Sequence, residues 1–451
     1  MRLLILGGTR FAGRAVVEAA QAEGIDVTTL NRGLSGRNAG GVRVLTADRT
    51  DPAALAGALG DQTWDAVIDT WSGAPKAVAD GCAALAGRAG HYCYVSTISV
   101  YADPLPPQAD EHAPLVDADP DRAEPLTDLA DYPAVKRGAE LAALRAFGDR
   151  ALIARPGLIL GPYENIGRLP WWLRRIERGG NVLAPGDPAT PLQYIDVRDL
   201  AGWLVNAARR GLTGAFNLTG KPGHATMGEL LDAAVEVIRT DAALVWIPQE
   251  RVLDAGVSPW TELPIWLPRD PEYDNHNKVD SSAARETGLA DRPVRETVAA
   301  TWAWLQAEGD PPPRPGIGLD PAREQAVLDA RDRLCPVRSA LAPAPRAGPK
   351  LLRTFTLSDR ILLANCARMA VPTDRPSARQ PPRPGRRRAA CAWSGVSGCR
   401  DTGAPARPST TWKITSSWWI DPRTQGAGYH EAGNCHVIAG LASRSSPDDG
   451  R

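Results

Sequence analysis

The first 13 residues constrain the fold more than any other part of the chain. A short apolar run, Arg2–Leu6, leads directly into the turn Gly7-Gly8-Thr9-Arg10-Phe11-Ala12-Gly13, and a helical pattern follows. Glycine allows a tight bend at Gly7 and a close approach of helix to sheet at Gly13, and the start of the helix offers N–H groups to a phosphate. The segment therefore predicts a β-α-β unit with a pyrophosphate-binding turn.

The same alternation of strand-like and helix-like runs continues through the first 300 residues. Apolar runs typical of strands occur at 2–6, 27–30, 42–45, 66–68, 91–96 and 151–154, and helical runs at 14–23, 52–59, 74–89 and 134–147. Strands that alternate with helices at this spacing predict an α/β fold with a doubly wound parallel sheet of the Rossmann type. A ligand is expected at the carboxyl ends of the strands.

Four regions are predicted along the chain of 451 residues. Residues 1–162 form an NAD(P)-binding domain with the catalytic residues, and residues 163–310 form a smaller α/β substrate-binding region that is interleaved with the sheet. Residues 311–334 contain a proline-rich linker and a terminal helix. In residues 335–451, Arg, Pro and Ser cluster without periodicity, so we expect a disordered basic tail or a read-through or shifted-frame extension.

The formal net charge of zero is the sum of two unlike parts. Residues 335–451 contain 18 Lys and Arg against 7 Asp and Glu, whereas residues 1–334 contain 34 against 45. Since an acidic region repels phosphate backbones, nucleic acid is not expected as a partner of residues 1–334, and the question stays open for the tail. No run of 18 apolar residues predicts a membrane span. Seven cysteines without a paired framework suit reduced thiols in the cytoplasm.

Two arginines and a missing carboxylate indicate which dinucleotide binds. Arg10 stands in the middle of the glycine turn, and the second strand is followed by Asn31-Arg32 rather than by Asp or Glu. A carboxylate at this place accepts a hydrogen bond from the ribose 2′-OH of NAD, whereas a cation suits a 2′-phosphate. The pattern predicts NADP as the cofactor, with NAD as the alternative. Asp48-Arg49, after the third strand, is placed to reach the adenine.

Candidate catalytic residues occur in two segments. Tyr132 and Lys136 stand four residues apart, which places them on one face of a helix. An ammonium group near a phenol lowers the phenol pKa from about 10, so the tyrosine can act as a general acid or base. Ser96 and Thr97 follow a strand, and their hydroxyls are expected at the carboxyl end of the sheet. There, one of them can form a hydrogen bond with the reacting oxygen.

Together these residues resemble the extended short-chain dehydrogenase/reductase family, the NAD-dependent epimerase/dehydratase group. The similarity extends over roughly residues 1–306, and several motifs in the family's order are more specific than any one of them. The motifs are the turn from Gly7 to Gly13, Asp48, Ser96-Thr97 before Val100-Tyr101, Tyr132 to Lys136 with Glu140, Arg155 to Pro162, Tyr194 to Ala201, and Phe216-Asn217-Leu218.

The resemblance implies a role for each candidate residue. Thr97 matches the catalytic Ser/Thr, Tyr132 the general acid/base, and Lys136 the residue that binds the nicotinamide ribose and lowers the pKa of Tyr132. Hydride would pass between the nicotinamide and a substrate carbon that bears a hydroxyl or carbonyl. The implied function is an NAD(P)-dependent oxidoreductase or epimerase-type enzyme. The residues expected to bind the cofactor are Gly7, Arg10, Phe11, Gly13, Asn31, Arg32, Asp48, Arg49, Ser96, Tyr132 and Lys136.

Two departures from the family bear on the small-molecule substrate. Nucleotide-sugar epimerases of the family usually have an Asn where this chain has Leu158, and an Arg where it has Leu192. Because both family residues help to hold a sugar nucleotide, a nucleotide-sugar epimerase or dehydratase is kept as an alternative. Trp71, after the fourth strand, is expected to narrow the pocket beside the cofactor, and Arg269 is a candidate for gripping an anionic group.

The same residues bear on other classes of function. The turn Gly-Gly-Thr-Arg-Phe also resembles that of chloroplast stem-loop RNA-binding relatives, which are binding modules on a dehydrogenase scaffold. The Tyr132/Lys136 pair and the acidic charge of residues 1–334 favour the enzyme. No metal site is expected, since the six histidines lack ligand spacing. The helices at 74–89 and 134–147 match those that pair two subunits in the family, so the resemblance implies a homodimer.

Overall fold

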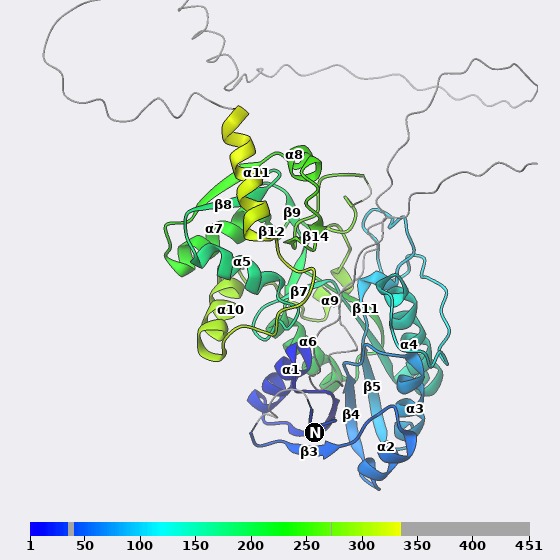
Figure 1. Ribbon diagram of the computed structural model, residues 1–451. Helices are drawn as coiled ribbons and strands as arrows, with labels where there is room; N and C mark the ends of the chain where they lie inside the picture. Colours follow the sequence, from blue (N-terminus) through cyan, green and yellow to red (C-terminus); the bar gives the residue numbers. More distant parts are fainter. Residues whose placement is uncertain (35–39, 272, 335–451) are drawn as a thin grey trace, which may run out of the picture. The chain divides into compact units, whose positions relative to one another are not determined.

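A seven-stranded parallel sheet organises the first two thirds of the described chain in the computed structural model of the protein (Figure 1). Residues 1–34, 40–271 and 273–334 are described, so the predictions made for residues 335–451 lie outside them. The strand order is β11-β6-β5-β4-β1-β2-β3. The strands are β1 (Arg2–Leu6), β2 (Asp26–Asn31), β3 (Arg43–Thr46), β4 (Trp64–Asp69), β5 (Ala89–Val95), β6 (Ala151–Pro156) and β11 (Gly214–Leu218). The predicted doubly wound α/β fold is confirmed.

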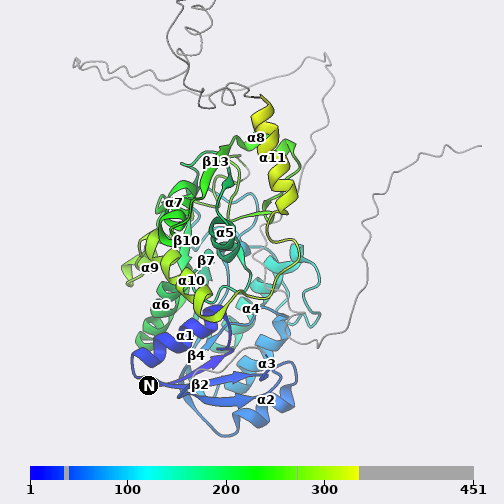
Figure 2. The ribbon, with the colours of Figure 1, turned by 60° about the vertical axis from the view of Figure 1, so that its left-hand side comes forward.

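Helices cover both faces of this sheet (Figures 1 and 2). One face carries α1 (Phe11–Ala22) and α6 (Val197–Arg210), and the other carries α2 (Pro52–Leu59), α3 (Pro75–Leu85) and α4 (Tyr132–Phe147). Side chains alternate across a strand, so Leu3 and Ile5 of β1 join the core beneath α1 and α6, while Leu4 and Leu6 join the core beneath the other three helices. The sheet is therefore buried on both sides, which explains its near-continuous apolar strands.

The direction of winding reverses between β1 and β4, which are neighbours in the sheet. After β1 the chain turns at Gly7 into α1 on one face, and after β4 it passes Thr70 towards α3 on the other face. Two segments that diverge from adjacent strands leave a crevice at the carboxyl ends of those strands, which is where open α/β sheets bind ligands.

A smaller region follows β6 and contains short strand pairs and most of the remaining helices. Its paired strands are β7 (Leu158–Leu160) with β10 (Tyr194–Asp196), β8 (Asn181–Pro185) with β13 (Ala243–Ile247), β9 (Pro191–Leu192) with β12 (Ala225–Thr226), and β14 (Pro259–Trp260) with β15 (Leu263–Pro264). Its helices are α5 (Arg168–Glu177), α7 (Met227–Ile238), α8 (Gln249–Asp254), α9 (Ser282–Glu286), α10 (Val294–Glu308) and α11 (Pro321–Leu334). Short 3₁₀ turns lie at Ile98–Val100, Leu129–Asp131 and Gly148–Arg150.

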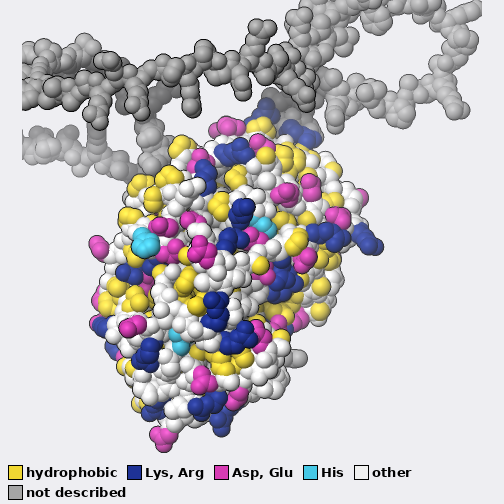
Figure 3. All heavy atoms as spheres, turned by 180° about the vertical axis from the view of Figure 1, so that it is seen from behind, with side chains coloured by type: hydrophobic (Ala, Val, Ile, Leu, Met, Phe, Trp, Pro, Cys, Tyr) yellow, Lys and Arg dark blue, Asp and Glu magenta, His cyan; other side chains and the backbone are white. Residues whose placement is uncertain are grey.

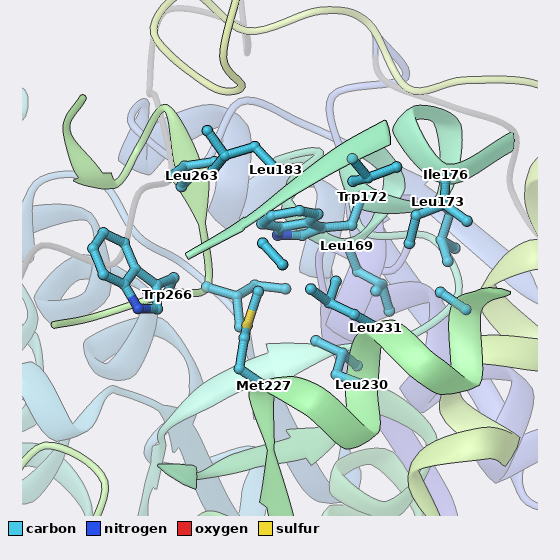
Figure 4. Close-up of a cluster of buried hydrophobic side chains, with 14 of the residues drawn as sticks. Leu169, Trp172, Leu173, Ile176, Leu183, Met227, Leu230, Leu231, Leu263 and Trp266 are labelled. Carbon is cyan, nitrogen blue, oxygen red and sulfur yellow. The ribbon is translucent and has the colours of Figure 1, made fainter. Parts of the chain in front are cut away.

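The core of this smaller region lies between α5 and α7 (Figure 4). The apolar side chains of α5 recur at helical spacing, from Leu169 through Trp172 and Leu173 to Ile176, and so turn one face towards α7. The indole Nε1–H of the buried Trp172 donates a hydrogen bond to the Pro264 carbonyl oxygen at 2.7 Å. This packing fixes α5 along its length, and with it the first turn of the helix.

The segment after α10 packs against the same region. The backbone N–H of Gly318 donates to the Thr261 carbonyl oxygen at 2.9 Å. Further along, Glu324 of α11 is only 4% exposed. Its carboxylate accepts hydrogen bonds from Arg175 Nε at 2.5 Å and from the Leu183 backbone N–H at 3.0 Å. A buried ion pair thus anchors α11 to α5 and β8.

A cluster of polar contacts joins α1 to α10, and we call it the Arg14 clasp. Both terminal nitrogens of Arg14 donate to the carboxylate of Glu308, at 2.7 and 2.6 Å. The guanidinium lies 3.8 Å from the ring centroid of Tyr163, and the hydroxyl of Tyr163 donates to Glu18 at 3.0 Å. The helix that begins at the glycine turn is therefore tied to the last part of the smaller region.

The surface of the described part carries charges of both signs. On the face seen in Figure 3, acidic and basic side chains are interspersed with small apolar areas. Within the described residues, no helix combines the length and the apolar character that crossing a membrane requires.

Candidate active site

The glycine turn is built so tightly that side chains at two positions would collide with its neighbours. Gly7 has φ 121°, and a Cβ placed on it would stand 2.5 Å from Thr70 Oγ1. A Cβ on Gly13 would stand 2.8 Å from the backbone nitrogen of Gly8. Because α1 starts at Phe11, directly behind this turn, its first N–H groups face the crevice between β1 and β4.

One cavity occupies this crevice and brings together most of the predicted site residues. It extends from the glycine turn, past the ends of β1, β4 and β5, to the first turns of α4 and α5. The predicted residues that line it are Gly7, Arg10, Phe11, Gly13, Asn31, Arg32, Arg49, Trp71, Ser96, Thr97, Tyr132 and Lys136.

Two predicted residues lie elsewhere. Asp48 closes a turn, since its Oδ1 accepts hydrogen bonds from the backbone N–H and the hydroxyl of Thr50, at 3.0 and 2.7 Å. Arg269 is exposed, donates to the Ala189 carbonyl oxygen at 2.6 Å, and lines a separate hollow together with Lys278. Neither residue is part of the cavity wall around the glycine turn.

Arg49 reaches the cavity but is committed to a buried ion pair. Its two terminal nitrogens donate to the carboxylate oxygens of Asp69 at 2.6 and 2.8 Å, and Tyr92 donates to the same carboxylate at 2.5 Å. Burial alone would raise the pKa of Asp69, but the charge and hydrogen bonds of Arg49, with help from Tyr92, hold it below its ordinary value. The guanidinium also lies 4.9 Å from the Trp71 ring, so Arg49 shapes the wall that Trp71 forms.

Thr97 and Tyr132 meet at the inner end of the cavity. Tyr132 is the first residue of α4, Thr97 follows β5, and each is 3% exposed. Burial raises the pKa of Tyr132 above its ordinary value, while the charge of Arg168 and a side-chain hydrogen bond with Thr97 act in the opposite direction. Tyr132 is therefore a protonated phenol near neutral pH, held in place next to a hydroxyl group.

Lys136 lies one helical turn beyond Tyr132 and is held by backbone carbonyls. Its Nζ donates to the carbonyl oxygens of Trp71 at 2.7 Å and Val95 at 2.6 Å, and lies 4.3 Å from the ring centroid of Tyr94. Burial lowers the pKa of Lys136 to about 7, although the charges of Asp69 and Glu140 raise it. A lysine in this state carries its charge in acid and loses much of it just above neutral pH.

Two charged residues in the cavity wall were missed by sequence reasoning. Arg168 begins α5 and is 3% exposed, and Arg314 comes from the segment between α10 and α11. Neither stands in a motif of fixed spacing, and only the folded chain brings them to the same cavity as Tyr132. The only sequence signal that pointed to Arg168 was its position directly after Gly167, at the start of a helix.

The motif residues around Arg155 form a buried brace behind the cavity. Arg155 donates twice to the carboxylate of Glu140, both times at 2.9 Å, which ties β6 to α4. The hydroxyl of Tyr101 donates to Asn217 Oδ1 of β11 at 2.7 Å and accepts from Arg155 at 3.1 Å. These motif positions therefore hold the sheet and α4 in register.

The cavity fits a nicotinamide dinucleotide. The glycine turn forms a cradle that a Cβ would fill, and the hydroxyl of Ser96, which is 4% exposed, lines the cavity without a hydrogen-bond partner among the described residues. Such a buried hydroxyl needs an external partner. Within the described residues, no group of three or more His, Cys, Asp and Glu is arranged to hold a metal ion.

A comparison with protein families decides the classification. Residues 3–218 match the model of the NAD dependent epimerase/dehydratase family. This part of the chain belongs to the family. Membership in the epimerase/dehydratase family supports an enzyme of the epimerase or dehydratase type that uses a nicotinamide dinucleotide. The matched span contains the glycine turn, Thr97, Tyr132, Lys136 and Arg168, whereas Arg314 lies beyond it.

Solved structures share the fold of this chain. The Bordetella bronchiseptica enzyme WbmH in complex with NAD+ aligns with a TM-score of 0.52 and 19% identity, covering 68% of this chain and 99% of that one. UDP-glucose 4-epimerase from Thermotoga maritima, solved with UDP-glucose, has a TM-score of 0.51 and 17% identity, covering 69% and 100%. The Thermus thermophilus UDP-glucose 4-epimerase complex with NAD gives 0.50 and 19%, covering 68% and 100%. No curated protein sequence matches the chain significantly.

Proposed function

We propose that the protein is an NADP(H)-dependent enzyme that acts on a carbon bearing a hydroxyl or carbonyl group in a small molecule. One observation supports this most directly: Thr97, Tyr132 and Lys136 line the same cavity as the glycine turn. When bound, the nicotinamide dinucleotide would accept or supply a hydride at that carbon. The protein would contribute binding, orientation and the movement of one proton.

Tyr132 is the proton-transferring residue in this proposal. Because burial keeps the phenol protonated, it can donate its proton to a developing alkoxide when a carbonyl is reduced. In the opposite direction the phenolate must form, and the hydrogen bond from Thr97 and the charge of Arg168 stabilise it. Thr97 also orients the substrate oxygen. Lys136 would bind the nicotinamide ribose. An ammonium group has three N–H donors, and the two carbonyls that hold Lys136 accept from only two of them.

The preference for NADP rests on the arginines at the other end of the cavity. Arg10 and Arg32 both line it, and burial together with the charge of Arg32 lowers the pKa of Arg10, so the two guanidinium groups lie within electrostatic reach of each other. A 2′-phosphate between two cations relieves their repulsion and forms charge-assisted hydrogen bonds. The Oδ1 of Asn31, at the place of the NAD-type carboxylate, accepts from the Gly33 backbone N–H at 2.9 Å.

The function can be tested on the full chain by a cofactor-difference spectrum and a substrate screen. We expect a saturable spectral change with NADPH, and NADPH oxidation or NADP reduction with a hydroxyl- or carbonyl-bearing compound. The screen includes UDP-glucose, so that nucleotide-sugar epimerisation is measured alongside reduction. Absence of any dinucleotide binding would exclude the proposal.

A nucleotide-sugar substrate is the second candidate, because solved structures with the same fold include UDP-glucose 4-epimerases. Against it stand two apolar side chains at positions where nucleotide-sugar epimerases of the family usually carry polar ones. Leu158 in β7 is 3% exposed and Leu192 in β9 is 2% exposed, so both contribute to the core. For the RNA-binding alternative, binding to single-stranded RNA at increasing salt, with the full chain and with residues 1–334, is the discriminating measurement.

We also propose a homodimer formed through α3 and α4. These two helices pack side by side, and Leu144 of α4 is 36% exposed, which makes it one of three exposed leucines among the described residues, with Leu34 and Leu253. The chain at residues 119–122 packs closely against α3 and α4. At Gly138 of α4, an added Cβ would stand only 2.5 Å from the carbonyl oxygen of Asp119. Sedimentation velocity of the full chain and of a Leu144→Arg variant tests this, with a shift to the monomer expected in the variant.

A further inference from the structure

Two guanidinium groups enter the cavity at the end where Tyr132 lies. Arg168 is buried at the start of α5, with its guanidinium carbon 5.4 Å from the centroid of the Trp260 ring. Arg314 donates through its Nε to the carbonyl oxygen of Asn165 at 3.0 Å, which fixes it at the cavity wall. The two side chains come from segments separated by almost 150 residues, so their meeting is a product of the fold.

Arg168 and Arg314 lie within electrostatic reach of each other and carry the same charge. Arg168 interacts electrostatically with Glu164, with Tyr132 and with Arg314, whose like charge opposes ionisation of Arg168. Glu164 is fully buried, and its two oxygens already accept hydrogen bonds from the backbone N–H groups of Arg168 and Leu169, at 3.1 and 3.0 Å. Arg168 and Arg314 therefore bring two like charges to the cavity wall beside Tyr132.

An anion between the two guanidinium groups would relieve their mutual repulsion. Arginine presents planar pairs of N–H donors that match the two oxygens of a carboxylate or a phosphoryl group. Ile159 and Ile166 line the cavity nearby. Apolar side chains limit the access of water and so strengthen ionic hydrogen bonds.

We propose that Arg168 and Arg314 form an oxyanion-binding subsite, and that the substrate carries a carboxylate or phosphoryl group close to the carbon served by Tyr132. The position of the reacting carbon rests on the proposed function, whereas binding of the anion does not. Among compounds with a hydroxyl or carbonyl group, the subsite selects those that carry a negative group a few bonds from the reacting carbon. Since Arg168 also acts on the phenol of Tyr132, the bound anion reduces the stabilisation that Arg168 gives to a phenolate.

The test is isothermal titration calorimetry of the full chain, with and without saturating NADPH, at low ionic strength. The probes are acetate, inorganic phosphate and UDP, which separate a carboxylate from a free phosphate and from a nucleoside diphosphate. We expect saturable binding of at least one probe. Arg168→Gln and Arg314→Gln should each weaken it at least about tenfold, as expected for the loss of one charge-assisted hydrogen-bonding group. The NADPH dissociation constant should stay within about twofold of wild type, because neither arginine belongs to the glycine-turn end of the cavity.

Three further variants keep the result interpretable. Arg178→Gln, an exposed residue directly after α5, serves as the matched control and should bind the probe like wild type. Arg168→Lys keeps the charge without the planar pair of donors and should bind the probe with intermediate affinity. This variant keeps the test valid even if Arg168→Gln does not fold. Tyr132→Phe should bind the anion normally while turnover is lost, which separates the subsite from the proposed function. Lack of saturable binding by all three probes, or wild-type affinity in both glutamine variants, would overturn the subsite.

Discussion

The Nζ of Lys136 donates a hydrogen bond to the carbonyl oxygen of Trp71 at 2.7 Å, and the backbone N–H of Trp71 donates to Asp69 at 2.9 Å. The buried pair of Asp69 and Arg49 therefore fixes the peptide that holds the lysine. Through this chain of contacts, a structural ion pair at the end of β4 determines where the proposed ribose-binding group lies.

The depressed pKa of Lys136 predicts a specific dependence of stability on pH. Its pKa in the folded protein is about 7, against an ordinary value of 10.5, so between these values the unfolded chain binds more protons and stability rises with pH. Below the folded pKa both states are charged, and the full cost of burying the ammonium is present. Lys136→Met removes this contribution, which is at most about 1.4 kcal/mol per pH unit.

The measurement is the free energy of unfolding in urea for both proteins over the range from about pH 6 to pH 9. The difference between variant and wild type should favour the variant most at the acidic end and shrink as pH rises. In Lys136→Met, the loss of the two hydrogen bonds to carbonyl oxygens lowers the free energy of unfolding by a similar amount at every pH, so it does not change the slope against pH. Parallel curves for the two proteins would contradict the assignment.

Asp69→Asn should destabilise the protein by about 3 kcal/mol or more, because the substitution leaves the buried Arg49 without its counter-charge. Urea unfolding at neutral pH measures this. Asp80→Asn is the control, since its pair with Lys76 on the surface of α3 is partly exposed and should contribute less than about 1 kcal/mol. Equal effects of the two substitutions would mean that the buried pair is not needed for stability.

Tyr132→Phe should lower kcat at least about 100-fold, since it removes the proposed proton donor, whereas the NADPH dissociation constant should change little. Steady-state kinetics with a substrate found in the screen and fluorescence titration of NADPH give the two values. Tyr163→Phe, which alters the Arg14 clasp outside the cavity, should retain wild-type kcat. Near-normal turnover in Tyr132→Phe would refute the acid/base assignment.

Arg32→Ser should weaken NADPH binding by about 10- to 100-fold and leave NADH binding nearly unchanged, because only NADPH has a phosphate for this cation to contact. Dissociation constants of both dinucleotides should be compared in wild type and variant. Arg43→Ser removes an arginine that donates to Gln62 on the surface and should change neither constant. A wild-type preference for NADH would exclude the proposed NADP specificity.

The sheet could be predicted because its strands and helices carry local signals. The apolar run Arg2–Leu6 coincides with β1, and the helical run 52–59 coincides with α2. In contrast, β9 and β12 have two residues each, too few for any periodicity, and they exist because tertiary packing brings Pro191-Leu192 beside Ala225-Thr226.

The candidate site was only partly accessible to sequence reasoning for a related reason. Tyr132 and Lys136 lie on one helix, so their spacing alone predicts that they share a face. The commitment of Arg49 to Asp69, 20 residues later, depends on the fold bringing the loop after β3 to the end of β4 and could not be read from the position of Arg49 after β3. Arg168 and Arg314 join the cavity through long-range packing, for which a single sequence carries no spacing rule.

The position of Arg314 has a consequence for biosynthesis. During synthesis from the N-terminus, the glycine turn, Thr97, Tyr132 and Arg168 are all made long before the segment between α10 and α11 completes the cavity wall. The residues at the glycine-turn end of the cavity are therefore all present in a nascent chain while Arg314 of the opposite wall is still missing. Completion of the last tenth of the described chain is what would turn a cofactor-binding intermediate into a protein that also selects its substrate.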